Sequence, residues 1–172
     1  MDEAIPARVD CTPAAAAMIG RLVAEHGPVL FHQSGGCCDG SAPMCYAAGE
    51  FRIGERDVFL GRVAGAPVWI GGQQFEYWAH THLTIDVVPG RGAGFSLEAP
   101  EGVRFLTRSR LFTDEESLAL QAAGPAPRGP EAALAAGATV AGEASLATRS
   151  SASNAAGGAV AASLASGAST SG

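Results

Sequence analysis

The aromatic residues of this chain are confined to one stretch. Its seven Phe, two Trp and two Tyr all lie between Phe31 and Phe112. From position 117 onward the sequence holds twenty Ala, nine Ser and eight Gly, and only four charged residues. A packed core needs large side chains to offset about 1–2 kcal/mol of backbone entropy per ordered residue. The sequence therefore predicts a single domain over residues 6–116 and a disordered low-complexity tail over 117–172.

The net charge and hydropathy of the chain limit the classes of binding partner that it could have. The net charge is −6, all eleven basic residues are Arg, and no run approaches 18 strongly apolar residues. An acidic chain without a basic cluster is a poor match for nucleic acid or an anionic membrane, and a membrane span is not predicted. The amino-terminal residues lack the pattern of a secretory signal, so a cytoplasmic location is expected. Thiols stay reduced there, and clustered cysteines more often bind metal or perform redox chemistry. The oligomeric state is left open.

The first predicted element is a helix over residues 13–26. Thr12 is a typical N-cap, Pro13 suits the first helical position, and Gly27 suits the left-handed position after the last turn. Short runs rich in Val, Ile, Phe and Trp then predict strands. The fold class is therefore α+β, with an amino-terminal helix packed on a mainly β domain. The predicted strands cover 29–31, 57–63, 67–70, 83–88, 94–97 and 103–107, and 73–79 is ambiguous between a strand and a helical turn.

A glycine-rich loop carries the first chemical signal. It reads Gly35-Gly36-Cys37-Cys38-Asp39-Gly40, with Cys45 shortly after it and His32 just before it. Paired glycines let the backbone approach a ligand closely, and thiolates are ligands for soft metals and iron–sulfur clusters. The loop therefore predicts a metal site whose ligands are Cys37, Cys38, Cys45 and His32. The alternative is a tight turn whose cysteines are small buried hydrophobic residues.

A second group of candidate metal ligands is His80, His82 and Asp86. In an extended segment both imidazoles project to one face, because side chains repeat every second residue. The segment has a loose likeness to a metal-binding strand of cupins, in which Asp86 would supply an oxygen ligand. The alternative is that these histidines are structural or solvated.

Arg104, Arg108 and Arg110 form a local basic patch that ends at Phe112. Arg and aromatic residues are common anchors in protein interfaces, so the patch predicts a docking surface for an acidic partner. The alternative is that Phe112 belongs to the core and the arginines solvate a strand edge. A catalytic constellation is not indicated, because the sequence lacks a Gly-x-Ser-x-Gly elbow, a His-Glu-x-x-His motif and a pair of carboxylates at telling spacing.

From Arg8 to Phe112 the chain resembles a small bacterial family of unknown function. Its members are called acetaldehyde dehydrogenase-associated, because their genes often lie beside aldehyde dehydrogenases. That resemblance implies a protein partner of the aldehyde dehydrogenase class and brings no mechanism with it. The segments that carry it are 31–40, Gln74-Phe75-Glu76-Tyr77-Trp78, 85–92 and 105–112.

A second resemblance is to the A-type iron–sulfur carriers, which have the HesB-like fold. The shared features are the capped helix, the short strand, the Gly-Gly-Cys loop, and a strand with Asp86 that leads into Gly92-Ala93-Gly94-Phe95. The resemblance implies that Cys37 or Cys38 is a cluster ligand. The carriers' carboxy-terminal Cys-Gly-Cys has no counterpart here.

Taken together, the sequence predicts a non-enzymatic accessory or carrier protein of aldehyde metabolism that binds a soft metal or an iron–sulfur cluster. Two alternatives stay open at this point. One is a thiol-redox enzyme or sensor that acts through Cys37 and Cys38, with Cys45 as a resolving thiol. The other is a cupin-like metal enzyme.

Overall fold

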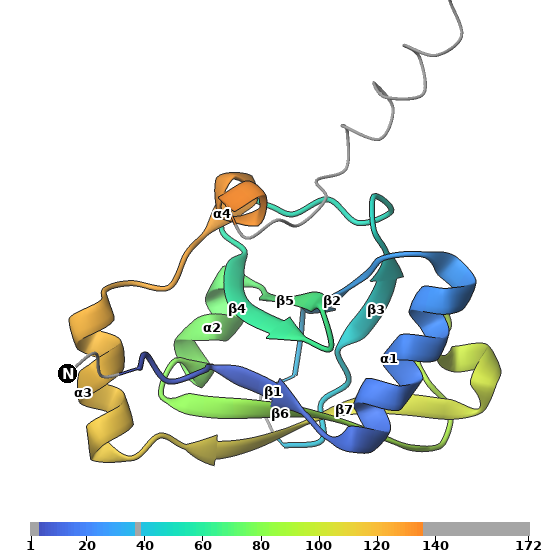
Figure 1. Ribbon diagram of the computed structural model, residues 1–172, viewed down its shortest axis with the longest axis horizontal. Coiled ribbons are helices and arrows are strands. Elements are labelled where there is room, and N and C mark those ends of the chain that lie inside the picture. Colours follow the sequence, from blue (N-terminus) through green and yellow to red (C-terminus); the bar gives the residue numbers. More distant parts are fainter. Residues whose placement is uncertain (1–3, 37–38, 136–172) are drawn as a thin grey trace, which may run out of the picture.

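Two β-sheets and a long helix surround a common core in the computed structural model, which describes residues 4–36 and 39–135 (Figure 1). The α+β class is thereby confirmed. Within the described residues, no helix is long and apolar enough to cross a bilayer. The elements, in chain order, are β1 (Val9–Cys11), α1 (Pro13–His26), β2 (Val29–Gln33), β3 (Met44–Ala47), β4 (Val58–Val63), β5 (Ala66–Ile70), α2 (Gly72–Trp78), β6 (Thr81–Pro89), the 3-10 helix η1 (Ala99–Glu101), β7 (Val103–Leu111), α3 (Asp114–Ala123) and α4 (Gly129–Ala135).

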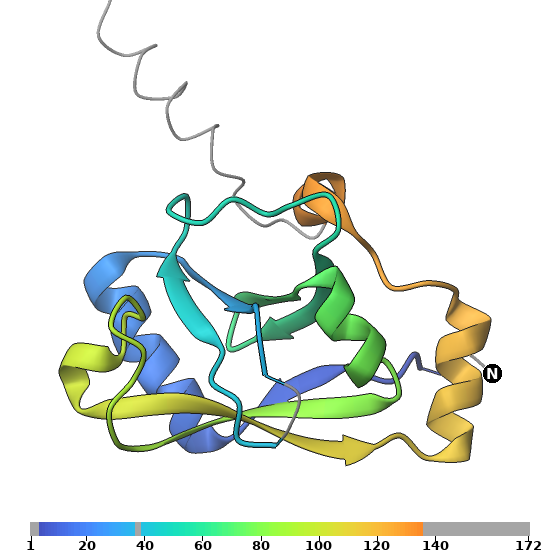
Figure 2. The same cartoon turned by 180° about the vertical axis from the view of Figure 1, so that it is seen from behind.

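The strands form a three-stranded sheet in the order β1-β6-β7 and a four-stranded sheet in the order β3-β2-β5-β4. In the first, β1 is parallel to β6, and the long β6 and β7 pair antiparallel from Thr81 opposite Leu111 to Pro89 opposite Val103. In the second, β2 and β5 are parallel neighbours, with β3 and β4 antiparallel on the two outer sides. Figures 1 and 2 show the four-stranded sheet lying across the three-stranded one.

Helix α1 begins and ends where the sequence predicts. The Thr12 side chain accepts a hydrogen bond from the Ala15 N–H, Pro13 occupies the first turn, and Gly27 ends the helix at a φ of 79°. Met18, Ile19 and Leu22 are the large side chains of its buried stripe, which packs on both sheets. Its cap, its proline and its terminal glycine therefore all act as their positions imply.

The core lies between the two sheets. Phe31 of β2 and Phe105 of β7 are fully buried and meet edge to face, with ring centroids 4.9 Å apart and planes at 88°. Such aromatic pairs add about 0.5–1.5 kcal/mol beyond the area they bury. One continuous apolar cluster joins side chains from α1 and from both sheets. The contact between Phe31 and Phe105 thus fixes how the sheets face each other.

The strand predictions for 29–31, 57–63, 67–70, 83–88 and 103–107 are confirmed in β2, β4, β5, β6 and β7, whereas the one for 94–97 is wrong. That segment is a series of turns before η1, and the Phe95 side chain is 89% exposed instead of packed in a sheet. The ambiguous segment 73–79 is the helix α2, and β1 and β3 are strands that the sequence pattern did not reveal.

Helical structure continues beyond the predicted boundary at residue 116, into α3 and α4. A reciprocal capping box between Thr113 and Glu116 starts α3, which buries Leu120. The chain then bridges to β4 and brings Ala132 of α4 against the buried cluster of Ile53 and Trp69. A small Ala side chain can pack on apolar surface that other segments supply, so an Ala-rich segment can join an existing core. Residues 136–172 of the predicted tail lie outside the described residues.

The turn between β4 and β5 offers a test of backbone strain. Ala64 has a φ of 46° and Gly65 a φ of 81°, the two positive values of a type I′ hairpin turn. A non-glycine residue in this region costs about 1–2 kcal/mol, and Asn tolerates it best. We expect Ala64→Asn to raise the free energy of unfolding by up to about 1 kcal/mol in urea titrations. Ala64→Val is the matched control and should lower it, and equal stability of the two variants would contradict this account.

Candidate functional site

A polar cleft of about 340 Å³ lies at the carboxyl ends of the parallel strands β2 and β5. Ligands commonly bind at this edge of parallel strands, because loops and helix starts converge there. The last residue of β2, Gln33, accepts the Gly71 N–H through its backbone oxygen at 3.0 Å, which joins β2 to the start of α2. Figure 2 shows α2 beside the end of β2. The cleft is lined by Ser34, Arg56, Gly71, Gly72, Gln73 and Gln74.

The first polar group of this cleft is the exposed Ser34 hydroxyl, which contacts a buried imidazole. Ser34 Oγ lies 2.6 Å from Nδ1 of His32, and only 4% of His32 is exposed. The two residues are two positions apart along an extended chain, so both side chains project to the same face of the sheet. A neutral imidazole that accepts a hydrogen bond from a hydroxyl can act as a base. It thereby raises the nucleophilicity of the hydroxyl oxygen.

A carboxylate lies on the far side of the same imidazole. Nε2 of His32 is 3.1 Å from Oδ1 of Asp57, although the N–H does not point along a hydrogen-bond direction. The other carboxylate oxygen, Oδ2, accepts the Gly54 N–H at 2.7 Å, which fixes the orientation of Asp57. Ser34, His32 and Asp57 therefore form a hydroxyl–imidazole–carboxylate chain.

Aromatic rings hold the imidazole in place. The His32 ring packs against Phe51 with centroids 4.4 Å apart, and Phe51 stacks on Tyr46 at 4.7 Å. The exclusion of water around His32 leaves its two nitrogens with Ser34 and Asp57 as their neighbours. The site is therefore rigid before any ligand arrives, which lowers the cost of binding and orientation.

The loop over residues 35–40, called the glycine–cysteine loop below, begins beside this cleft. Its two ends are hydrogen-bonded to different elements. On the near side, the Gly36 carbonyl accepts the side-chain N–H groups of Gln74 and Trp78 on α2. On the far side, Asp39 accepts the Ser109 N–H of β7 at 2.6 Å, and the Gly40 N–H donates to Thr107 O at 2.7 Å. The flanks of the loop are thus held between a helix and a strand.

The structure does not bring together the predicted metal ligands that it describes. His32 and Phe31 alternate on β2, and Cys45 of β3 stands opposite Phe31, so Cys45 and His32 lie on opposite faces of the sheet. Cys45 is fully buried in the core, and both nitrogens of His32 already face polar neighbours. Cys37 and Cys38 lie outside the described residues. Among those that are described, no group of three His, Cys, Asp or Glu side chains could hold a metal.

The two described thiols, Cys11 and Cys45, are free and protonated at neutral pH. Burial raises the pKa of Cys45, and the nearby Glu98 carboxylate raises it further. Burial and the adjacent Asp10 also raise the pKa of Cys11. Thiols react as thiolates, so neither cysteine has the environment of a reactive nucleophile.

The second metal group is also separated. His80 is exposed and lines a hollow of about 470 Å³ beside α3, whereas His82 is buried next to Phe112. Asp86 accepts hydrogen bonds at 2.8 Å from Thr12 Oγ1 and from Arg108 Nε, and these bonds lower its pKa. Its carboxylate therefore ties β6 to α1 and β7, and the cupin-like set is not assembled.

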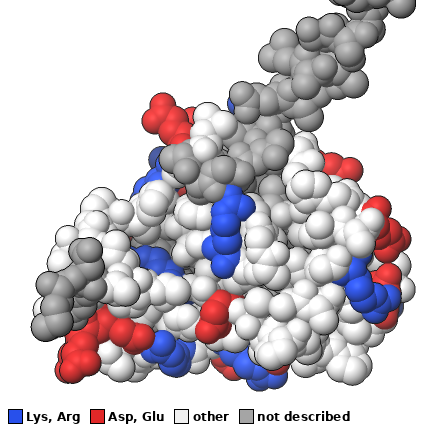
Figure 3. Space-filling view, viewed as in Figure 1, with Lys and Arg blue, Asp and Glu red and all other residues white. Residues whose placement is uncertain are grey.

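The predicted docking surface is largely satisfied within the chain. Arg110 forms two 2.8 Å bonds to Glu116, Arg108 is paired with Asp86, and Phe112 is buried. Arg104 is half-buried beside Gly90. Figure 3 shows basic and acidic side chains next to each other along the edge formed by β6 and β7. Phe112 is therefore a core residue, as in the alternative, whereas Arg108 and Arg110 pair with carboxylates and remain about half exposed.

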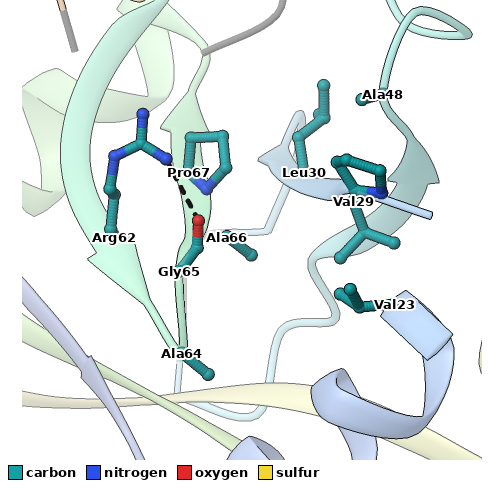
Figure 4. A pocket seen from close by; sticks show the side chains of 10 residues that line it. Val23, Val29, Leu30, Ala48, Arg62, Ala64, Gly65, Ala66 and Pro67 are labelled. Atoms are coloured by element: carbon teal, nitrogen blue, oxygen red, sulfur yellow. Dashed lines mark hydrogen bonds between the residues drawn. The ribbon is translucent and has the colours of Figure 1, made fainter. Parts of the chain in front are cut away.

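A separate apolar hollow of about 210 Å³ lies at the opposite ends of β2 and β5. Figure 4 shows Val23, Val29 and Leu30 facing Pro67 and Arg62 across it. The Arg62 guanidinium donates to Gly65 O at 3.0 Å. None of its lining side chains is a nucleophile or a base, so this hollow is suited to packing or to binding and not to chemistry.

Sequence reasoning named His32 but missed Ser34 and Asp57. The signal for Ser34 is present in the sequence, because His-x-Ser at the end of a strand places both side chains on one face. Asp57 is separated from them by more than twenty residues, and its approach depends on the parallel pairing of β2 with β5 and on the turn at Gly54. No local pattern reveals that contact.

The geometry of the loop predicts unequal effects for its two glycines. Gly36 has a φ of +92°, and a Cβ there would lie 2.5 Å from Ser41 Cβ, whereas a Cβ on Gly35 would meet open space. We expect Gly36→Ala to lower the free energy of unfolding by about 1–3 kcal/mol, the usual cost of overpacking and strain. Gly35→Ala is the matched control and should cost less than about 1 kcal/mol. Urea titrations of both variants check this, and equal losses would contradict it.

The raised pKa values of Cys11 and Cys45 predict slow alkylation of the folded protein. At pH 8 both thiols should react with iodoacetamide far more slowly than after unfolding in guanidinium, with Cys45 the slower. The raised pKa of Cys45 also means that the folded state holds a proton that the unfolded state loses. Stability should therefore fall as pH rises above the ordinary thiol range, and Cys45→Ala should remove that part of the pH dependence. Rapid alkylation of Cys45 in the folded protein would contradict the prediction.

Comparison with known proteins gives a family and no function. No curated protein matches the chain. The family described as Domain of unknown function (DUF779) matches residues 18–111, which is more than half of the chain. The match runs from within α1 to the end of β7, so it includes both β2 and β5, the glycine–cysteine loop and the whole polar cleft. The chain belongs to the DUF779 family.

Proposed function

We propose that this chain is a small thiol-redox protein whose activity resides in Cys37 and Cys38 of the Gly-Gly-Cys-Cys loop. The observation that supports this most directly is the attachment of the loop at both ends, through Gly36 to α2 and through Asp39 to β7. A loop that only connects two strands has no need of hydrogen bonds to two other elements. The hydrogen bonds of Gly36 and Asp39 therefore support a functional role for the segment between them.

The remaining cysteines and the separated ligands favour thiol chemistry over metal binding. The buried Cys45 is a protonated core residue, so it is unsuited to be a metal ligand or a resolving thiol for the loop. His32 lies on the other face of the sheet and faces Ser34 and Asp57. The residues described do not fit the four-ligand site that the sequence predicts. A soft metal or an iron–sulfur cluster would need ligands other than these two.

The proposed reaction joins the sulfur atoms of Cys37 and Cys38 in a disulfide. The two thiols give up two protons and two electrons, and a hydroperoxide accepts them and becomes an alcohol and water. A cellular dithiol returns the pair to the reduced state by exchange. Adjacent cysteines form a strained disulfide, and strained disulfides are the labile and regulatory ones.

The proposal extends to the setting in which this chemistry would act. The resemblance to an acetaldehyde dehydrogenase-associated family supports an accessory role beside an aldehyde dehydrogenase in the cytoplasm. Arg108 and Arg110 pair with Asp86 and Glu116 but stay about half exposed, so a partner that docks there would meet ion pairs and not free charges. We propose instead that the aldehyde dehydrogenase contacts the chain near the glycine–cysteine loop, where the thiol chemistry would occur.

The deciding experiment counts reactive thiols in the protein purified without oxygen. We expect two thiols to react rapidly with iodoacetamide, to disappear after one equivalent of hydrogen peroxide, and to return with dithiothreitol. Peptide mass spectrometry should locate the disulfide between Cys37 and Cys38. Cys37→Ser and Cys38→Ser should each abolish the disulfide. Cys11→Ser, which removes a thiol on β1, is the matched control and should leave the disulfide intact.

Metal analysis of the same sample separates the competing function. Iron or zinc at a fixed stoichiometry that is lost in Cys37→Ser/Cys38→Ser would replace the redox proposal with the metal site. A pair of thiols that survives peroxide unchanged would also end the redox proposal.

A further inference from the structure

We propose that Ser34, His32 and Asp57 form a second site, a hydrolytic one, which cleaves small esters that carry an anionic group. The inference is independent of the thiol chemistry of the loop, since none of its residues is a cysteine. It rests on a built arrangement: an exposed hydroxyl, a buried imidazole at 2.6 Å and a carboxylate at 3.1 Å beyond it.

The arrangement has the order of groups that a serine nucleophile needs. With the proton on Nε2 toward Asp57, the lone pair of Nδ1 faces Ser34 and accepts its hydroxyl proton. Asp57 does not reach the cleft, so it is a positioning residue that holds this tautomer and stabilises the imidazolium. Its off-line approach to Nε2 is typical of a site without substrate, where such hydrogen bonds are long or poorly aligned.

Burial strengthens the pair. His32 is buried, with only 4% of its surface exposed, while Ser34 is exposed at the cleft. A buried histidine with a purely structural role needs no solvent-facing hydroxyl as its nearest partner. The imidazole base is therefore shielded from water, and the hydroxyl nucleophile is accessible to a substrate. Hydrolysis by a serine requires both.

The cleft itself indicates the class of substrate. Its volume of about 340 Å³ is at the lower end of the range for small-molecule sites. Arg56 is the charged side chain among its lining residues. A Cβ on Gly72 would lie 2.5 Å from the Arg56 carbonyl oxygen, so a glycine there lets α2 begin against the Arg56 backbone and form the wall. A guanidinium on a residue that lines the same cleft as the nucleophile favours an ester with a carboxylate or phosphate.

The reaction balances without a cofactor. Ser34 Oγ bonds to the ester carbonyl carbon as its proton passes to Nδ1 of His32. The tetrahedral intermediate then expels the alcohol, which takes that proton, and the acyl group stays on Ser34. Water repeats the sequence and releases the acid, so the net reaction is ester plus water to acid plus alcohol.

The test uses the full chain carrying Cys37→Ala/Cys38→Ala, which removes the thiols that could also attack an ester. The probes are 4-nitrophenyl acetate, the 4-nitrophenyl monoester of glutaric acid, and phenylmethanesulfonyl fluoride. We expect hydrolysis of both esters, and the sulfonyl group on Ser34 in peptide mass spectrometry. Ser34→Ala should abolish both, while Ser117→Ala, a half-buried hydroxyl on α3, should change neither.

Two further variants separate catalysis from folding. His32→Gln should lower kcat by about 100-fold or more, the contribution of a positioned base, while the exposed His80→Gln should not. Asp57→Asn should lower kcat with little change in KM, which keeps the test valid if His32→Gln does not fold. Arg56→Ala should raise KM for the anionic ester alone. Absence of hydrolysis, activity that persists in Ser34→Ala, or a label on another residue would overturn the proposal.

Discussion

Strand β2 is buried on both faces, and this constraint governs the rest of the molecule. Its alternation sends Phe31 inward to meet Phe105 and sends His32 to the opposite side, where Phe51 covers it. Gln33 points inward again and binds Thr107 of β7 through its side chain. A shift of one residue in register would exchange these roles and place an imidazole in the apolar core. The core and the polar cleft are therefore specified by the same five-residue strand.

The parallel pairing of β2 with β5 divides the four-stranded sheet into two different ends. At the amino ends lies the apolar hollow beside Val23, and at the carboxyl ends lies the polar cleft beside Ser34. The chain leaves β2 and β5 at the same end of the sheet, so the glycine–cysteine loop and helix α2 begin side by side. Chemistry-bearing residues from distant parts of the sequence gather there because of strand direction and not because of sequence spacing.

Local features of the fold could be predicted from the sequence, and contacts between distant segments could not. The helix 13–26 is correct because its cap, proline and glycine act within one turn of the backbone. The strand expected at 94–97 fails because Phe95 is apolar in sequence but lies in solvent. Helices continue past the expected boundary at 116 because a composition argument counts only a segment's own side chains, whereas Ala132 packs on a cluster of Ile53 and Trp69 that other segments supply. His32 could be recognised as a site residue from the sequence. That its side chain and the Cys45 side chain lie on opposite faces of the sheet depends on the register between β2 and β3.

Gln33 explains how one strand end can support two kinds of chemistry. Its backbone oxygen receives the Gly71 N–H, its side-chain oxygen receives the Thr107 hydroxyl, and its side-chain nitrogen donates to the Gly35 carbonyl. These bonds join α2, β7 and the loop to a single buried residue placed between His32 and Ser34. A buried amide that is satisfied on all sides is rigid, because loss of any partner leaves an unpaired polar atom in the interior. The direction in which the chain leaves β2 is thereby fixed, and with it the start of the glycine–cysteine loop at Gly35. Thiol chemistry in the loop and hydroxyl chemistry in the cleft would then share one rigid support while remaining chemically separate.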